Sequence, residues 1–146
     1  MGRSSAPPSI PFALACVASV KILRREASVK WAMREEPENV NDSGWRLYSE
    51  DDTPEFLDSP SSMQIANFNT VGSLFPVVYL LYFQPVGSEY MLVKDVKDDS
   101  LHWYDYNTLE DGKLSPLVVD DAFWARYWDQ WEAESKRVHQ LFHSDE

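Results

Sequence analysis

The hydrophobic positions in the first part of the chain follow patterns typical of strands. Residues 14–23 are apolar and compatible with one strand, in which Cys16, Ala18, Val20 and Ile22 share a side. In residues 29–34 apolar and polar positions alternate, which predicts a half-buried strand with Val29, Trp31 and Met33 on its apolar face. Residues 45–49 return to this pattern, with Trp45 and Leu47 on one face.

The middle of the chain gives less regular patterns. Residues 61–71 fit neither period, which leaves a short strand or a turn of helix open. Residues 77–83 form a continuous apolar and aromatic run between two prolines, which favours a short buried element, although a helix is compatible with it. Residues 91–96 and 101–106 flank a polar turn and predict a hairpin, and Glu110-Asp111-Gly112-Lys113 marks another turn.

The C-terminal region carries the clearest helical pattern. Asp120 or Asp121 can cap a helix start by accepting hydrogen bonds from free backbone N–H groups. The apolar residues that follow are spaced by three and four, which predicts one stripe along a helix: Trp124, Tyr127, Trp128, Trp131, Val138, Leu141 and Phe142. At this spacing a core role for the tryptophans is favoured over a ligand cage.

Strands followed by a closing helix predict an α+β fold, with a mainly antiparallel sheet and a long amphipathic C-terminal helix. The 146 residues fit one domain. Residues 1–11, rich in serine and proline, read as a flexible arm, and residues 12–146 as a single domain.

Charge limits the classes of partner. The net charge of −11 argues against binding nucleic acid through phosphates and against docking on anionic lipid, because both need a basic surface. Much of the excess lies in residues 34–58, where two arginines stand among nine carboxylates. A basic protein partner fits this balance better. The lone Cys16 excludes an internal disulfide and a multi-cysteine metal site.

No apolar stretch reaches the ~18–20 residues of a membrane-spanning helix. Residues 10–20 share some features with a secretory leader, but prolines crowd the start of this run and only Arg3 is basic there. A buried first strand and a cytoplasmic location are therefore preferred.

Side chains that could carry chemistry lack the partners that chemistry needs. Glu35, Glu36 and Glu38 could act in acid–base catalysis only within a cleft, which the sequence does not indicate. His139 and His143 have the spacing of two metal ligands on a helix, but no third ligand is indicated. Cys16 in an apolar strand fits a small buried hydrophobe better than a nucleophile. We therefore predict no catalytic residue, no metal and no cofactor.

The segment Arg34–Trp45 is the most informative one. It contains a proline break, a polar turn and a glycine suited to positive φ before the next strand, which Trp45 would anchor in the core. Its order of residues, Arg-Glu-Glu-Pro, a spaced Asn39, then Asp-Ser-Gly-Trp-Arg ending at Arg46, resembles a bacterial family first catalogued as a domain of unknown function. That family was assigned to the immunity proteins of polymorphic toxin systems, as number thirty-three. Further similar positions lie at Trp31, Asp58, Pro60, 69–71 and 86–88, so the resemblance covers roughly residues 14–90. The hairpin and helix in 91–146 lie outside it.

The resemblance implies an α+β protein that neutralises a co-encoded toxin without catalysis of its own. A cognate protein toxin is thus the expected partner, and the acidic loops are the candidate contacts. The residues chosen are Glu35, Glu36, Glu38, Asp42, Glu50, Asp51, Asp52 and Glu55. Two alternatives stay open: a small enzyme or ligand-binding domain with a pocket near Glu35, Asp42 and Trp45, or an interaction module that uses the tryptophan-rich helix.

Overall fold

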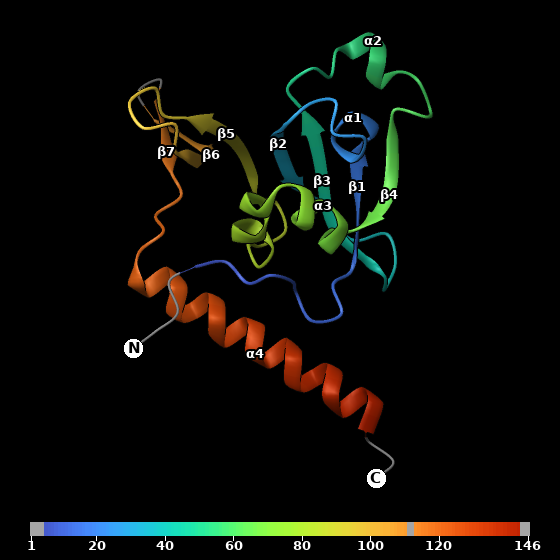
Figure 1. Ribbon diagram of the computed structural model, residues 1–146, viewed down its shortest axis with the longest axis vertical. Coiled ribbons are helices and arrows are strands. Elements are labelled where there is room, and N and C mark those ends of the chain that lie inside the picture. Colours follow the sequence, from blue (N-terminus) through green and yellow to red (C-terminus); the bar gives the residue numbers. More distant parts are fainter. Residues whose placement is uncertain (1–4, 111–112, 144–146) are drawn as a thin grey trace.

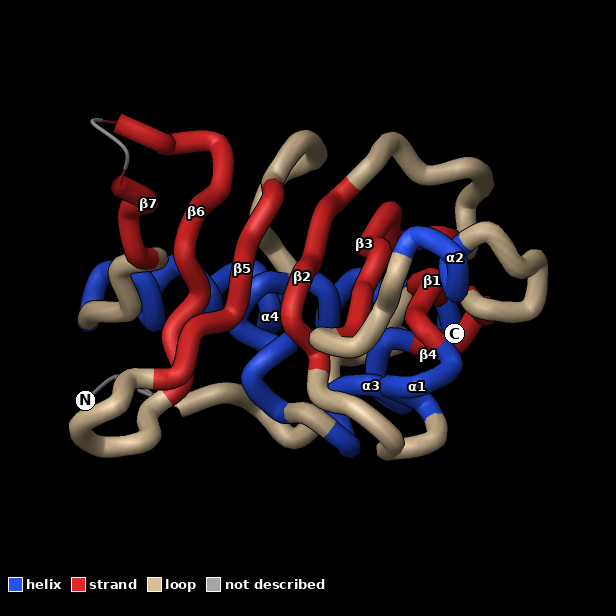
Figure 2. The backbone as a smooth tube through the Cα atoms, turned by 90° about the horizontal axis from the view of Figure 1, so that it is seen from above, coloured by secondary structure: helices blue, strands red, loops and turns tan. Residues whose placement is uncertain are grey.

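The structure, a computed structural model, describes residues 5–110 and 113–143. Within these residues, seven strands form one sheet in the order β4-β1-β3-β2-β5-β6-β7, and Figure 2 shows them side by side with helix α4 running behind. Strands β1 and β3 are parallel, and every other neighbouring pair is antiparallel. The strands are β1 (Ala15–Ser19), β2 (Val29–Arg34), β3 (Asp42–Ser49), β4 (Met63–Asn67), β5 (Glu89–Lys94), β6 (Leu101–Glu110) and β7 (Lys113–Pro116). The predicted α+β class with a mainly antiparallel sheet is confirmed.

Helical segments cover one side of the sheet, except the short turn Pro54–Leu57, which buries no residue and lies beyond the ends of the strands. They are α1 (Val20–Leu23), α2 (Pro54–Leu57), α3 (Phe68–Leu74), the 3₁₀ helix η1 (Pro76–Leu81) and α4 (Asp121–His143). Figure 1 shows α4 as the outermost layer, with α3 and η1 between it and the strands. The Tyr127 hydroxyl of α4 donates to the Tyr79 carbonyl of η1 over 2.6 Å. The long helix therefore docks on η1.

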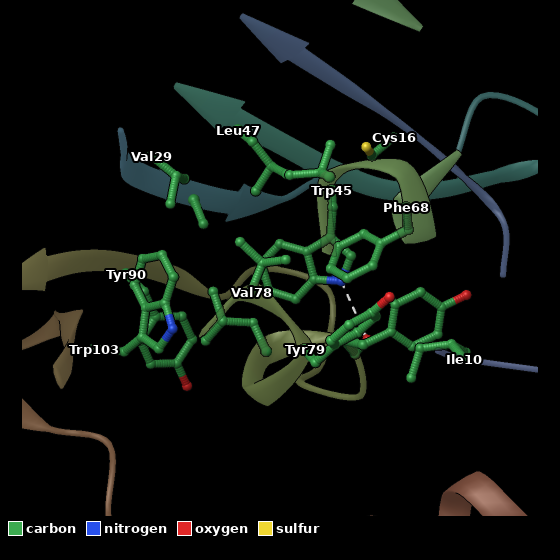
Figure 3. Close-up of a cluster of buried hydrophobic side chains, with 14 of the residues drawn as sticks. Ile10, Cys16, Val29, Trp45, Leu47, Phe68, Val78, Tyr79, Tyr90 and Trp103 are labelled. Atoms are coloured by element: carbon green, nitrogen blue, oxygen red, sulfur yellow. Dashed lines mark hydrogen bonds between the residues drawn. The ribbon is translucent and has the colours of Figure 1, made fainter. Parts of the chain in front are cut away.

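The core lies between the sheet and this helical layer (Figure 3). Trp45 and Leu47 of β3 are fully buried and meet Phe68, Val78 and Tyr79 from α3 and η1. Because successive strand residues point to opposite faces, Arg46 and Tyr48 lie on the other face of the sheet. This division into a covered and an open face positions every site described below.

The first strand is shorter than the sequence predicts. Strand β1 ends at Ser19, and residues 20–23 form the single helical turn α1 instead of extending the strand. The reason is local, because the Ser19 side chain accepts a hydrogen bond from the Lys21 N–H and so caps the turn. Ile22 remains buried, but on a helix.

The predicted apolar face of residues 29–34 is wrong in part. Val29 and Ala32 are buried, whereas Trp31 is 36% exposed. The register between β2 and β3 shifts between Val29 and Trp31, and such a bulge moves the following side chains to the opposite face. Trp31 therefore lies on the open face of the sheet, beside Tyr48.

The ambiguous segments resolve into several short elements. Residues 61–71 contain both of the proposed structures, since β4 is followed directly by α3, which the Asn67 side chain caps. Residues 77–83 lie largely in η1, so this apolar run is helical. The hairpin of β5 and β6 is confirmed. At the turn predicted for Glu110–Lys113, β6 pairs with β7, while Asp111 and Gly112 lie outside the described residues.

Helix α4 begins as predicted. Asp120 accepts a hydrogen bond from the Phe123 N–H, which is the expected cap. Trp124 and Tyr127 are buried, whereas Trp128 and Trp131 are half-buried and Leu141 is exposed. The side chain of Phe142 lies outside the described residues. No helix in the described part of the chain is both long enough and apolar enough to cross a bilayer.

Residues 5–11 differ from the flexible arm that the sequence predicts. Ile10 is buried, and its backbone N–H and carbonyl are both bonded to the Asn69 side chain, at 2.8 and 3.0 Å. Tyr79 donates its hydroxyl to the Pro8 carbonyl, and Trp131 donates its indole N–H to the Ser9 carbonyl. The segment is therefore held between α3, η1 and α4, by contacts too distant in sequence for a local pattern to reveal.

Candidate functional site

The Arg34–Arg46 motif forms the end of β2, the connecting loop and the start of β3. Its centre is a buried ion pair in which Arg46 donates two hydrogen bonds to the Asp42 carboxylate, from Nη1 at 3.0 Å and from Nη2 at 2.8 Å. The remaining lone pairs of the carboxylate accept the backbone N–H groups of Gly44 and Glu38, both at 2.9 Å. Arg46 also donates from Nε to Glu35 over 3.1 Å. Each charge in this cluster is thus matched by direct hydrogen bonds.

These contacts fix the charge state of the pair. Hydrogen bonds from Arg46, and then from the Glu38 and Gly44 backbone, hold the pKa of Asp42 well below its usual range, although burial opposes this. The hydrogen bond with Asp42 raises the pKa of Arg46 further. Asp42 stays ionised at any pH near neutrality, so it cannot serve as the proton-exchanging acid of a catalytic centre.

Gly44 allows the loop to close against β2. Its φ is +89°, and a Cβ at this position would lie 2.2 Å from the carbonyl oxygen of Glu35. Its own carbonyl accepts the Glu35 N–H at 2.8 Å. Only glycine combines this conformation with this close approach.

Arg34 and Trp45 connect the motif to the rest of the molecule. Arg34 donates from Nε to the Ser43 carbonyl at 2.9 Å and from Nη1 to the Gln84 carbonyl at 2.7 Å. The indole N–H of Trp45 donates to the Tyr82 carbonyl at 3.1 Å. Both residues therefore tie the β2–β3 connection to the segment that follows η1.

The eight predicted contact residues fall into two groups at opposite ends of β3 (Figure 1). Glu35, Glu36 and Glu38 precede the strand, Asp42 is its first residue, and residues 50–55 follow it. The length of the strand, about 25 Å, therefore separates the two groups. The structure brings each group together but does not join the two groups into one face. We refer to them as the 35–38 loop and the 50–55 loop.

Six of the eight carboxylates are exposed, and two are turned inward. The exposed ones are Glu35, Glu36, Glu38, Glu50, Asp51 and Glu55. Asp42 is held by Arg46, as described, and Asp52 accepts hydrogen bonds from the Ser49 N–H, the Ser49 hydroxyl and the Ser19 hydroxyl. Asp42 and Asp52 thus organise the ends of β3, and the other six display charge to solvent.

The three residues considered for a pocket, Glu35, Asp42 and Trp45, do not line one hollow. A hollow of about 210 Å³ is lined by Asp42 and Glu38 but by neither Glu35 nor Trp45. Trp45 is buried on the covered face, whereas Glu35 and Asp42 meet around Arg46, on the other face. The pKa of Asp42 is lowered, the reverse of what an acid–base residue near neutrality requires.

Cys16 is fully buried, and burial raises the pKa of its thiol to about 12. A nucleophilic cysteine needs the thiolate, so the predicted role as a small core residue is confirmed. Among the described residues no cluster of three metal-ligating side chains occurs, and the side chain of His143 lies outside them.

The interaction module considered on helix α4 finds limited support. Trp124 is buried in the core, and the indole N–H of Trp131 is bonded to Ser9. For Trp124 this matches the core role that the spacing favours, whereas Trp128 and Trp131 keep partly exposed edges and Leu141 is exposed.

One surface feature was missed at the level of sequence. Trp31, Met33, Tyr48 and Tyr106 gather on the open face of the sheet, around a hollow of about 260 Å³ with Glu89. Tyr48 stands at the opposite parity to Trp45 and Leu47, which was an available signal. The alternating pattern of residues 29–34 does not indicate the bulge in β2 that brings Trp31 to the same face.

The fold and the motif together define an α+β domain in which the Asp42–Arg46 cluster holds the β2–β3 connection in place. Residues 16–102 match the model of the Immunity protein Imm33 domain, and the chain therefore belongs to this family of immunity proteins. The match includes the resemblance noted for the Arg34–Arg46 motif and continues past Tyr90 into β6. No curated protein and no solved structure matches the chain.

Proposed function

We propose that this chain binds a toxin encoded beside it and neutralises that toxin by occupying its surface, in the bacterial cytoplasm and without catalysing a reaction. The observation that carries the proposal is membership of the immunity protein family over more than half of the chain. The arrangement of its polar residues is consistent with a binding role.

Residues that could perform chemistry are engaged elsewhere. Asp42 and Arg46 neutralise one another, Asp52 caps the end of β3, and Cys16 is sealed in the core. These groups maintain the fold, which leaves recognition to the exposed side chains.

The proposed contacts are the exposed carboxylates of the 35–38 loop and the 50–55 loop. The arginines nearest to them in sequence, Arg34 and Arg46, direct their guanidinium groups into internal hydrogen bonds. Arg46 also pairs with Glu35, so the charge that these loops offer to solvent comes chiefly from Glu36, Glu38, Glu50, Asp51 and Glu55. A toxin with a basic surface would be drawn to such loops, chiefly through a faster association.

Co-expression with the product of the adjacent gene tests this proposal. The wild-type chain should restore growth of cells that carry the toxin. We then compare two charge-reversed variants, E36K/E38K in the first loop and D51K/E55K in the second. Glu35, Asp42 and Asp52 stay unchanged because they hold structural hydrogen bonds.

Because the loops lie at opposite ends of β3, one variant should lose protection and the other should keep it, which identifies the contacting loop. If both variants protect as well as wild type, the acidic contacts are refuted. If wild type gives no protection, the immunity role itself is refuted.

A further inference from the structure

The hollow on the open face of the sheet has the composition of a binding pocket for a side chain. It opens among Trp31 and Met33 of β2, Tyr48 of β3, Glu89 of β5 and Tyr106 of β6. Trp31 is 36% exposed and Tyr106 is 46% exposed, so their rings are available to a partner. Tryptophan and tyrosine in such positions are the residues most often central to protein interfaces.

Strand register builds the walls of the hollow. Trp31 stands opposite Tyr48 on one side and Met91 on the other, and Met33 stands opposite Glu89. The rings of Trp31 and Tyr106 meet edge to face, with centroids 5.6 Å apart. Because four strands hold these side chains, the hollow is formed before any partner binds, which lowers the entropic cost of binding.

The size of the hollow sets the kind of occupant. Its volume of about 260 Å³ lies just below the ~300–1,000 Å³ of pockets that hold whole small ligands. It exceeds by far the ~30 Å³ that one water molecule occupies. One long side chain from another protein fits this range.

The charge of the hollow sets the chemistry of that side chain. Its lining has one charged group, the Glu89 carboxylate, and no lysine or arginine. Arg46, beside Met33 on β3, is already matched by Asp42 and Glu35. Aromatic faces and a carboxylate together favour a cation, whereas an apolar side chain would strip water from Glu89 without replacing it.

We propose that this hollow receives an arginine side chain of the partner protein, stacked on the ring of Trp31, which Tyr106 meets edge to face, and paired with Glu89. The flat guanidinium can stack on a ring while it donates hydrogen bonds in its plane, which the more strongly hydrated ammonium of lysine does less well. This arginine would be one contact of the neutralised toxin, so the inference rests on the proposed function. It places that contact on the open sheet face, beside the aromatic residues.

The test uses the full chain and a defined probe, the acetylated and amidated tripeptide Gly-Arg-Gly. The matched control peptide carries citrulline, which keeps the shape of arginine without its charge. We follow the Trp31 indole N–H resonance by NMR at constant ionic strength, and assign it with a Trp31→Phe variant. The arginine peptide should shift this resonance and saturate with a dissociation constant on the order of 10 mM.

Glu89→Gln should weaken that binding about threefold to tenfold, because it removes the paired charge and retains the shape. Glu132→Gln, an exposed position on helix α4 on the other side of the sheet, should leave it unchanged. The inference is overturned if the Trp31 resonance does not move up to about 50 mM peptide, if citrulline binds equally well, or if Glu89→Gln binds as wild type.

The two proposals fail separately. If the wild-type chain neutralises the toxin and Glu89→Gln and Trp31→Ala do so equally well, the arginine contact is wrong and the immunity role stands. If the arginine peptide binds but wild type gives no protection against the toxin, the hollow is real and the immunity role is wrong.

Discussion

Asp42 and Arg46 show why the polar residues of the family motif occur in a fixed order. The pair is almost fully buried, and such a pair is tolerated only when hydrogen bonds satisfy both groups. Asp42 receives two backbone N–H groups from the loop as well as two bonds from Arg46. The order of these residues is therefore explained by the folding of the β2–β3 connection.

Replacing Asp42 by asparagine should reduce the free energy of unfolding by about 3 kcal/mol, because Arg46 would keep a buried charge without its main partner. Urea denaturation at pH 7 measures this loss. Glu36→Gln is the matched control, since Glu36 is an exposed carboxylate of the same loop, and it should change the stability by less than ~0.5 kcal/mol. Equal effects of the two substitutions would contradict the structural role of Asp42.

The same pair predicts a dependence of stability on pH. The folded-state pKa of Asp42 lies below the unfolded value of about 3.9, so its contribution is complete above that value. It is lost progressively as the pH falls below about 4 toward the folded-state pKa. In the Asp42→Asn variant, stability should therefore fall less steeply than in wild type over this acidic range, as urea midpoints at several pH values would show.

Gly44 and Gly87 offer a comparison at two positive φ angles. Alanine at Gly44 would be strained by its φ of +89° and would place a Cβ 2.2 Å from the Glu35 carbonyl, whereas alanine at Gly87 meets nothing within 4 Å. We expect Gly87→Ala to cost about 1 kcal/mol and Gly44→Ala at least ~3 kcal/mol in unfolding free energy. Thermal and urea unfolding of both variants check this, and equal losses would show that the close approach is unimportant.

At the scale of elements, the N-terminal segment acts as a spacer between α4 and the remainder of the helical layer (Figure 1). Asn69 fixes it by bonding both backbone groups of Ile10, and accepts a third bond from the Tyr79 hydroxyl. The position of α4 therefore depends on a segment that lies more than a hundred residues away from it in sequence.

Asn69→Ala should lower the unfolding free energy by about 2 kcal/mol, because it leaves buried backbone groups of Ile10 unsatisfied. It should also speed hydrogen exchange in the part of α4 near Trp131, which bonds to Ser9 of the same segment. Asn107→Ala, which removes one exposed bond to the Gly87 carbonyl, is the control and should leave α4 unchanged. Unaltered exchange in Asn69→Ala would show that α4 docks independently of the segment.

Elements governed by local patterns could be predicted, and those governed by distant contacts could not. The period of α4, its Asp120 cap and the β5–β6 hairpin follow from neighbouring residues. The helical turn after Ser19 and the bulge near Trp31 break a run that looks regular in sequence. The ordering of Ile10 depends on Asn69, which no local pattern contains.

The candidate site, too, could be predicted only in part from the sequence. The motif and its charges could be read directly, but burial separates Asp42 and Asp52 from the six exposed carboxylates. The length of β3 separates the two loops in space, although both lie close to that strand in sequence. A sequence shows how much charge a segment carries, and the fold decides which ends of the molecule present it.

At the scale of the whole molecule, negative charge is displayed at both ends of β3, with an aromatic face between the ends in the sheet. A basic partner should therefore associate faster at low ionic strength, with the rate falling as salt screens the loops. Apolar contacts on the open face should instead govern dissociation. The two contributions can be separated by their dependence on salt.

Binding of the purified chain to the purified product of the adjacent gene shows whether the chain neutralises that toxin by direct contact. Calorimetric titration, with the activity of the toxin followed in parallel, should give a saturable complex. Inhibition of the toxin should be complete at the same molar ratio at which binding saturates. Absence of heat and undiminished toxin activity, with a chain that is shown to be folded, would show that the chain is not an immunity protein against this toxin.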